Sequence, residues 1–377
     1  MLDRQPIARG FFGGLVLAGI ACALTAAPSP ARARHGKRQI GHSVKIGGNT
    51  FRIWGGANTG VMPKGCSVSP NGKHLYVTNF GLRRGKNVDV LDAVTLRRIR
   101  TLHWRGNAIE SVSSLTSKTL YVTDFYKSKV HKISTATWQI TKTARLRRLP
   151  KWMILSPDGK TLYVANWLGR VVKLNARSLK RLGRVKTGRH PRGLSVTADG
   201  KTLYVANTGG RTVSVVDTAT MRVRKQIPTS RYPRHTALTA DGKLLYVSVL
   251  RKGRIEVIDT ALGKVVHKIY VGAMPRTIAL SKDEKFLYVA VYAKHYLAII
   301  DTKTRKAITL DLDIVKASGL AVHPTDKLIY VTGWCSSDVW TIQRIRPGGK
   351  PGPLGRKPRH RRYYHRSKVN PYSLGCR

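Results

Sequence analysis

The chain has 377 residues and carries 69 lysines and arginines against 18 acids, so its formal net charge is +51 with neutral histidines. Apolar residues make up 42% of the sequence, which excludes wholesale disorder and supports a packed core. The excess of cations argues against a neutral or acidic surface and favours polyanionic partners such as nucleic acid, acidic polysaccharide or an anionic envelope.

Residues 1–33 have the pattern of a secretory signal peptide. Arg4 and Arg9 form a basic start, residues 11–27 form an apolar run, and an Ala-Arg-Ala cleavage pattern ends at Ala33. The apolar run is too short to predict a transmembrane helix, and no later stretch approaches the required length. Cleavage after Ala33 removes three arginines and one aspartate, so +49 of the +51 remains. We therefore expect a secreted, periplasmic or cell-surface protein.

A lipid anchor is the minor alternative for the amino-terminal segment. Cys22 ends a possible lipobox, but Gly19 stands where a bulky aliphatic residue is expected. The pattern therefore favours a cleaved leader over an anchored one.

A short hydrophobic pattern recurs seven times along the chain, each copy centred on one tyrosine. The tyrosines are 41 to 45 residues apart and are Tyr76, Tyr121, Tyr163, Tyr204, Tyr246, Tyr288 and Tyr330. Such a regular period of β-branched and aromatic segments predicts four short antiparallel strands per unit. The sequence therefore predicts an all-β fold, a seven-bladed β-propeller, with the tyrosines packed between blades.

The fourth repeat shows the expected anatomy of a blade. Strands are expected at 193–198, 202–206, 212–217 and 223–228. The pair Asp199-Gly200 makes the first hairpin, because glycine tolerates the positive φ that a tight turn needs. The second repeat lacks this pair and reads Thr116-Ser117 instead.

The two ends of the repeat region are expected to close the ring. Residues 338–345 can form the third strand of blade 7, but no fourth strand follows. Residues 51–55 precede blade 1 and look like a missing outer strand, so we predict that this amino-terminal strand completes blade 7. Closure removes the exposed edges that invite aggregation. The expected parts are a signal peptide (1–33), a short segment (34–43), the propeller (44–346) and a basic tail (347–377).

The repeats resemble those of the YVTN-repeat family of seven-bladed propellers over about residues 44–346. The LYVTN and LYVAN cores, the turn at Ser156–Lys160 and the run at Val213–Thr220 carry the resemblance. It implies the propeller fold and an exported or surface protein. Similar scaffolds occur in lactonases and in large subunits of amine dehydrogenases, so the fold leaves the function open.

Two columns of side chains are expected on one face of the propeller. Twelve residues before each repeat tyrosine the sequence has Lys64, Ile109, Lys151, Arg192, Arg234, Arg276 and Ser318. Four residues after each tyrosine it has Phe80, Phe125, Trp167, Thr208, Leu250, Tyr292 and Trp334. Five members of the first column are cationic and five members of the second are aromatic. This pattern predicts a cationic funnel with an aromatic rim on which bases or sugars can stack. The alternative is a solvated ring of cations with aromatics that only pack.

Most acids are expected on the opposite face, at the hairpin turns. Glu110 and Asp124 are the exceptions, and this pair is a weak candidate for acid–base catalysis. His190 and His235 lie near the funnel in adjacent blades, but two histidines without a third ligand make a weak metal candidate. No metal is therefore expected, nor a cofactor, because the sequence has no GxGxxG loop, haem-attachment motif or GxSxG elbow.

Cation density is also high on the outer strands of the first four blades. Residues 97–192 contain 23 lysines and arginines against three acids, which predicts a second cationic surface or a solvated edge. The stretch from 344 to 377 has eleven lysines and arginines and no acid, so the tail should be extended or flexible unless something pins it.

Three cysteines remain after cleavage. A Cys335–Cys376 disulfide would hold the basic tail across the funnel, whereas a Cys66–Cys335 bond would lock two neighbouring blades. The first is favoured because Cys66 suits a buried thiol.

Together these features predict an exported, monomeric module that binds a polyanion, either single-stranded nucleic acid or acidic polysaccharide. An anionic envelope surface is a further possible partner. The alternatives are a lactonase-like hydrolase that uses the same funnel and an envelope scaffold that contacts proteins.

Overall fold

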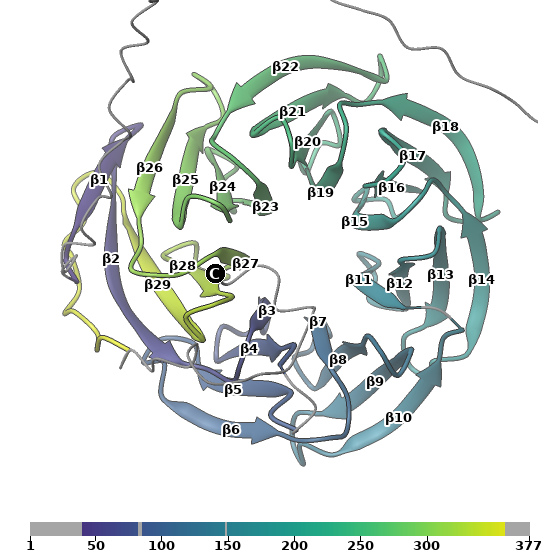
Figure 1. The fold of residues 1–377 in the computed structure, drawn as a ribbon, viewed down its shortest axis with the longest axis horizontal. Helices are drawn as coiled ribbons and strands as arrows, with labels where there is room; N and C mark the ends of the chain where they lie inside the picture. The colour runs from purple at the N-terminus through teal and green to yellow at the C-terminus, as the bar shows by residue number, and fades with distance from the viewer. Residues whose placement is uncertain (1–39, 82–84, 148, 359–377) are drawn as a thin grey trace, which may run out of the picture. The chain divides into compact units, whose positions relative to one another are not determined.

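The computed structural model describes residues 40–81, 85–147 and 149–358. The signal peptide predicted for residues 1–33 therefore lies outside the described residues, as does Cys376. The described residues form 29 β-strands and no helix, and these strands build seven sheets around a common centre (Figure 1). No described segment is thus a helix long and apolar enough to span a membrane.

Each of the first four blades is an antiparallel sheet whose strands follow one another in chain order. Blade 1 has β3 (Pro63–Val68), β4 (His74–Asn79), β5 (Val88–Asp92) and β6 (Arg98–Leu102). Blade 2 has β7 (Ala108–Ser113), β8 (Thr119–Asp124), β9 (Lys129–Ser134) and β10 (Ile140–Arg145). Blade 3 has β11 (Pro150–Leu155), β12 (Thr161–Asn166), β13 (Arg170–Asn175) and β14 (Arg181–Lys186). Blade 4 has β15 (Pro191–Val196), β16 (Thr202–Asn207), β17 (Thr212–Asp217) and β18 (Arg222–Pro228).

The remaining three blades complete the ring. Blade 5 has β19 (Pro233–Leu238), β20 (Leu244–Val249), β21 (Arg254–Asp259) and β22 (Lys264–Tyr270). Blade 6 has β23 (Pro275–Leu280), β24 (Phe286–Val291), β25 (Tyr296–Asp301) and β26 (Ala307–Asp311). Blade 7 has β27 (Ala317–Val322), β28 (Leu328–Gly333), β29 (Asp338–Ile345), β2 (Asn49–Asn58) and β1 (Ser43–Ile46).

The predicted closure of the ring by the amino-terminal strand is confirmed. Strand β2 pairs antiparallel with β29, from Thr50 opposite Ile345 to Asn58 opposite Asp338. The inner strand of blade 7 also contacts that of blade 1, so the inner strands form a continuous ring. One difference is the fifth strand of this sheet, β1, which reaches β2 through a turn with positive φ at two successive glycines.

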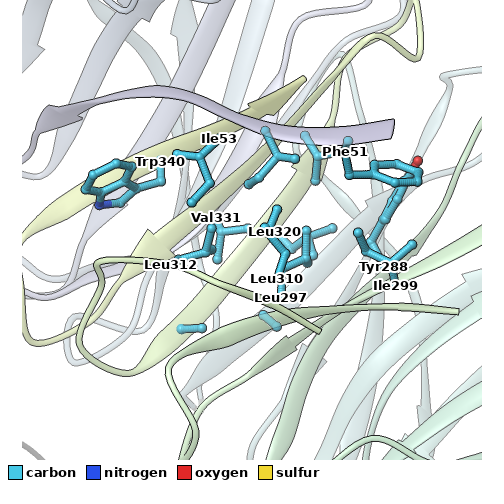
Figure 2. Packing of buried hydrophobic residues seen from close by; sticks show 14 of the residues in the cluster. Phe51, Ile53, Tyr288, Leu297, Ile299, Leu310, Leu312, Leu320, Val331 and Trp340 are labelled. Carbon is cyan, nitrogen blue, oxygen red and sulfur yellow. The ribbon is translucent and has the colours of Figure 1, made fainter. Parts of the chain in front are cut away.

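The seven repeat tyrosines pack between blades, as predicted. Each is at most 6% exposed, and each joins a hydrophobic cluster between two neighbouring sheets. Some hydroxyls also bond to the next blade: Tyr121 donates to the Ala176 carbonyl at 2.9 Å and Tyr330 to the Ala93 carbonyl at 2.6 Å. The cluster between blades 6 and 7, shown in Figure 2, is built around Phe51, Tyr288 and Trp340.

A buried arginine fastens the closing blade to its neighbour. Arg344 of β29 donates to Asn49 Oδ1 at 2.9 Å and to Asp283 Oδ2 of blade 6 at 2.7 Å, and it also pairs with Asp326 of blade 7. The guanidinium is 1% exposed and also lies over the Phe286 ring. Charge-assisted hydrogen bonds of this kind fix geometry strongly, so the lock holds the last blade in register.

The first part of the predicted basic tail is held against blade 7. The Gly355 N–H donates to the Trp54 carbonyl and the Gly56 N–H to the Arg356 carbonyl, both at β2. Lys357 Nζ also pairs with Asp313 at 3.0 Å. Residues 347–358 are therefore pinned along the outer strand of the ring.

Candidate anion-binding site on the propeller axis

A cavity lies where the inner strands of the seven blades meet. It is small, with about 20 Å³ of room for the centres of water-sized molecules, and it is partly open to solvent. Six of the seven positions of the predicted inner column line it; these are Lys64, Ile109, Lys151, Arg192, Arg234 and Ser318. The seventh, Arg276, lies beside it and donates from Nη1 to Ser318 Oγ at 3.3 Å. The structure thus brings the five predicted cations together at one place.

A bulge at the start of each inner strand places these side chains. In all seven blades the pairing with the second strand shifts register directly after the first residue of the strand. In five blades that first residue is proline, which lacks an N–H and suits a strand start. The column residue falls in the bulge and leaves the regular ladder, as bulges near binding sites commonly do.

In the part of the chain that the structure describes, the five cations share the cavity with a single acid, Glu110, and none of them forms an ion pair. Among the described residues, no carboxylate forms an ion pair with any of the five. Arg276 Nε is buried without a hydrogen-bond partner in the described part of the chain. Arg234 is buried and the other four are half-buried. Like charges held together with restricted access to water are unfavourable unless an opposite charge joins them.

Burial lowers the pKa of all five cations, and neighbouring cations lower it further in four of them. Burial contributes most and neighbouring cations add to it, so the pKa values of Lys64, Lys151 and Arg234 fall well below their usual values. Burial and Arg276 lower the pKa of Arg192 to about 9, and burial lowers the pKa of Arg276 to about 10. A bound anion would reverse these effects by favouring the charged forms.

Glu110 is the one acid among the residues that line the cavity. Burial raises its pKa to about 8, against the opposing pull of Lys64 and Arg192. It is 3% exposed, and its carboxylate packs on Gly65 of the next blade, where a Cβ would meet Oε1 at 2.6 Å. A side chain at position 65 would therefore force the Glu110 carboxylate to move.

Asp124, the other weak catalytic candidate, has different surroundings from Glu110. Trp104 Nε1 donates to its Oδ2 at 3.0 Å, the Asn107 N–H donates to its Oδ1 at 3.0 Å, and His131 Nε2 lies 3.6 Å away. Burial raises the pKa of Asp124, but the nearby His131 ring and the hydrogen bond from the Asn107 N–H outweigh it and lower the pKa. Its contacts hold blade 2 together, and it does not line the cavity.

The aromatic column pairs with the cations. Lys64 Nζ lies 4.4 Å from the Trp334 ring centroid and Lys151 Nζ lies 3.9 Å from that of Phe125. The guanidinium carbon of Arg276 lies 3.2 Å from the centroid of Tyr292. Such cation–π contacts partly compensate for the missing acids.

Two of the five rim aromatics are shielded from solvent and three are partly open. Phe125 is 7% and Tyr292 6% exposed, whereas Phe80, Trp167 and Trp334 are half-buried. Trp167 also stacks on His190, with ring centroids 4.5 Å apart and an interplanar angle of 9°. Fewer aromatic rings are therefore open to a ligand than the sequence pattern predicted.

The two histidines proposed as weak metal ligands have separate roles in packing. His235 lines the cavity, accepts from the Ile278 N–H at 3.4 Å and meets the Trp152 ring edge-to-face. Burial lowers its pKa to about 3, so it is neutral. Within the described ranges, no group of three His, Cys, Asp or Glu side chains is arranged to hold a metal.

Several lining residues lie one position beyond the predicted column. Trp152, His235 and Thr277 each follow a column cation directly and line the same cavity. At the corresponding place in blade 4 stands Gly193, whose Cβ would lie 2.6 Å from the His235 Cα. Reading the repeat at this next position would have found them.

The cysteines are in two states. Cys66 is a buried free thiol, whereas Cys335 is disulfide-bonded. The alternative bond between these two is thus not formed. The Cys335–Cys376 pairing stays a prediction, because Cys376 lies outside the described residues.

Parts of the chain match two family models. Residues 109–223 match the lactonase model, described as a 7-bladed β-propeller, and residues 234–324 match the cytochrome D1 heme domain. Each match spans less than a third of the chain. The first supports the likeness to lactonase-type propellers that the repeats indicated, while membership of the YVTN-repeat family stays a prediction.

Individual relatives agree with the fold. Antigen Lp49 of Leptospira interrogans is 30% identical over 108 residues, which are 28% of this chain and only 24% of that protein's length. Hydrazine synthase of Kuenenia stuttgartiensis has a TM-score of 0.68 at 21% identity, covering 75% of this chain and 95% of that one. The propeller domain of Cps50 (Swd1) from Myceliophteria thermophila has a TM-score of 0.66 at 15% identity, covering 77% and 99%. At these identities the solved structures show the shared fold alone.

Proposed function

We propose that this chain is an exported binding module that takes an anionic group of a polyanion into the axial cavity. Five cations that converge on one cavity with a single acid, Glu110, and no ion pair among the described residues carry the proposal. An entering phosphate, sulfate or carboxylate group replaces the repulsion among them with attraction. The polyanions considered are single-stranded nucleic acid and acidic polysaccharide.

The rest of the surface supports recruitment of the same partners. The net charge of +51 raises the local concentration of any polyanion and speeds encounter at low salt. A relative that bears the name antigen fits an exposed, exported location. We propose that the module acts as a monomer, and that the outer strands contribute to non-specific adhesion to an anionic envelope.

Salt dependence and paired variants test the proposal. Replacing Arg192 and Arg234 by glutamine should weaken binding of single-stranded DNA and lower the slope of log affinity against log salt by about 0.7 for each lost phosphate contact. The measurement is a fluorescence-anisotropy titration at several salt concentrations.

Exposed cations on β14 provide the matched control. Arg181 and Arg184 carry the same charge but lie on an outer strand and are exposed. If their replacement by glutamine weakens binding as much as the axial pair does, the site lies on the outer rim and the proposal is wrong.

A lactonase-like hydrolase is the second candidate, because Glu110 supplies a general acid or base at the cavity. Its pKa of about 8 suits proton transfer near neutral pH, and the surrounding region matches the lactonase model. Lactone hydrolysis that is lost in Glu110→Gln would support this function. Equal rates of lactone hydrolysis in the wild type and the Glu110→Gln variant would contradict this second function.

A further inference from the structure

We infer that the axial site selects an oxyanion that carries a flat ring, and that its ligand class is the nucleotide: a phosphate joined through a sugar to a base. This inference rests on the proposed anion site and names its ligand. The carrying observation is an aromatic platform that borders the cavity on one side only.

The platform consists of four rings that follow the second strands of blades 7, 1 and 2. Phe80 lies 5.7 Å from Trp334, 6.0 Å from Phe125 and 5.6 Å from Tyr126 between ring centroids. Tyr126 is 49% exposed and the Phe80 and Trp334 side chains are half-buried, so part of the platform faces solvent. Exposed apolar patches on a protein surface are a common mark of ligand-binding sites.

The platform touches the cations directly. Lys64 and Lys151, which line the cavity, lie over Trp334 and Phe125 at 4.4 and 3.9 Å. A phosphate bound by these ammonium groups therefore sits at the edge of the aromatic surface. The base of the same nucleotide can then lie on Phe80 and Tyr126, because every base has a π-face that stacks on aromatic rings.

The other side of the rim offers no comparable surface. Trp167 is covered by His190 on one side and has Lys151 and Arg192 over its ring at 4.9 and 5.4 Å. Tyr232 lies near two guanidinium groups, at 5.0 and 6.0 Å. Cations or His190 thus lie over the rings on this side, whereas the platform presents the partly exposed rings of Phe80 and Tyr126 beside the cations. This arrangement matches a ligand with a ring at one end and charge at the other. A uniformly charged chain would leave the platform unused.

A ligand series on the wild-type protein tests this without any variant. Calorimetric titrations at constant ionic strength compare inorganic phosphate, adenosine 5′-monophosphate, adenosine and glucose 6-phosphate. We expect the nucleotide to bind about fivefold or more tightly than phosphate, since one stacked base adds at least this factor. Glucose 6-phosphate should bind like phosphate.

Tyr126→Ala should remove most of the advantage of the nucleotide and leave phosphate affinity unchanged. Tyr270→Ala is the matched control, because Tyr270 is 73% exposed on the outer strand β22 and should change neither affinity. If Tyr126→Ala leaves the nucleotide advantage intact, the platform does not bind the base.

The outcomes separate the two proposals. Equal affinities for phosphate, nucleotide and glucose 6-phosphate would overturn the nucleotide inference and leave the anion site standing. Binding of none of them would overturn the anion site itself. The nucleotide could be free or could be the phosphorylated end of a nucleic-acid strand, and a thymidine decamer with a 5′-phosphate tests the second source. If this decamer competes with adenosine 5′-monophosphate for binding, the inference is supported for both sources. Equal binding of the 5′-hydroxyl decamer without such competition contradicts it.

Discussion

Replacing Lys64 and Lys151 together by methionine should make the ligand-free protein more stable, by about 1–4 kcal/mol at pH 7, and weaken anion binding about tenfold or more. Both lysines line the axial cavity, and burial with the neighbouring guanidiniums lowers their pKa. Methionine keeps the length of the side chain and removes the unfavourable charge. The measurements are urea unfolding in a buffer of weakly binding anions and titration with inorganic phosphate.

The pH dependence of this gain has a definite sign. A lysine whose pKa is lower in the folded than in the unfolded chain destabilises the fold at low pH, and this penalty disappears as pH rises toward the unfolded value of about 10.4. The advantage of the methionine variant should therefore shrink between pH 7 and pH 10. Lys243→Met is the control, since its side chain is 81% exposed and the change should stay within about 0.5 kcal/mol. A loss of stability in the double variant would mean that the cations hold the fold.

Replacing Arg344 by methionine should cost about 3–5 kcal/mol of stability, because it leaves the buried Asp326 carboxylate and the half-buried Asp283 carboxylate without this partner. Arg344 contacts Asp283, Asp326 and Asn49 and so joins blades 6 and 7 at the closure of the ring. The measurement is the free energy of unfolding at pH 7. Arg346→Met is the matched control: Arg346 lies 3.7 and 3.6 Å from the same two carboxylates but is 60% exposed, and its loss should cost less than about 1 kcal/mol.

Acid should reduce the difference between the wild type and the Arg344 variant. The hydrogen bonds from Arg344 and Ser281 lower the pKa of Asp283 in spite of the opposing effect of burial. A carboxyl with a lowered folded pKa stabilises the fold above its unfolded value of about 3.9, and this contribution is lost as pH falls below that value. Equal costs for Arg344→Met at pH 7 and pH 2.5 would show that packing of the side chain, rather than its charge, fastens the blade.

The fold was predictable because one short period repeats. The tyrosine spacing fixed the blade count, and the missing strand after β29 pointed to the amino terminus. Strand β1 was not predicted because it has only four residues and lies outside the repeat. It is held by pairing with β2 along its length and by Val44 and Ile46, which pack against the cluster between blades 6 and 7. At the first hairpin turn of blade 2, Ser117 adopts φ 60°, as Glu284 (55°) and Asp326 (61°) do in blades 6 and 7, whereas the other four blades have glycine there.

The candidate site was predictable in position but not in its contacts. The inner column followed from the repeat, and the bulges that aim it are common to all blades. The aromatic rings that are covered by a cation are determined by side-chain packing across blades. The shielding of Phe125 and Tyr292 therefore could not be predicted from the sequence spacing. Asp124 was placed near the funnel by its position in the repeat, whereas its partners His131 and Trp104 come from parts of blade 2 outside that pattern.

The most direct test of the axial anion site is to locate an anion by its own scattering. Crystals of the protein soaked in selenate would be measured at the selenium absorption edge. We expect the strongest anomalous peak in the axial cavity, within hydrogen-bond reach of Lys64, Arg192 and Arg234, and we expect it to vanish in the Lys64→Met, Lys151→Met variant. Peaks confined to exposed outer strands such as β14, with none on the axis, would contradict the proposed function.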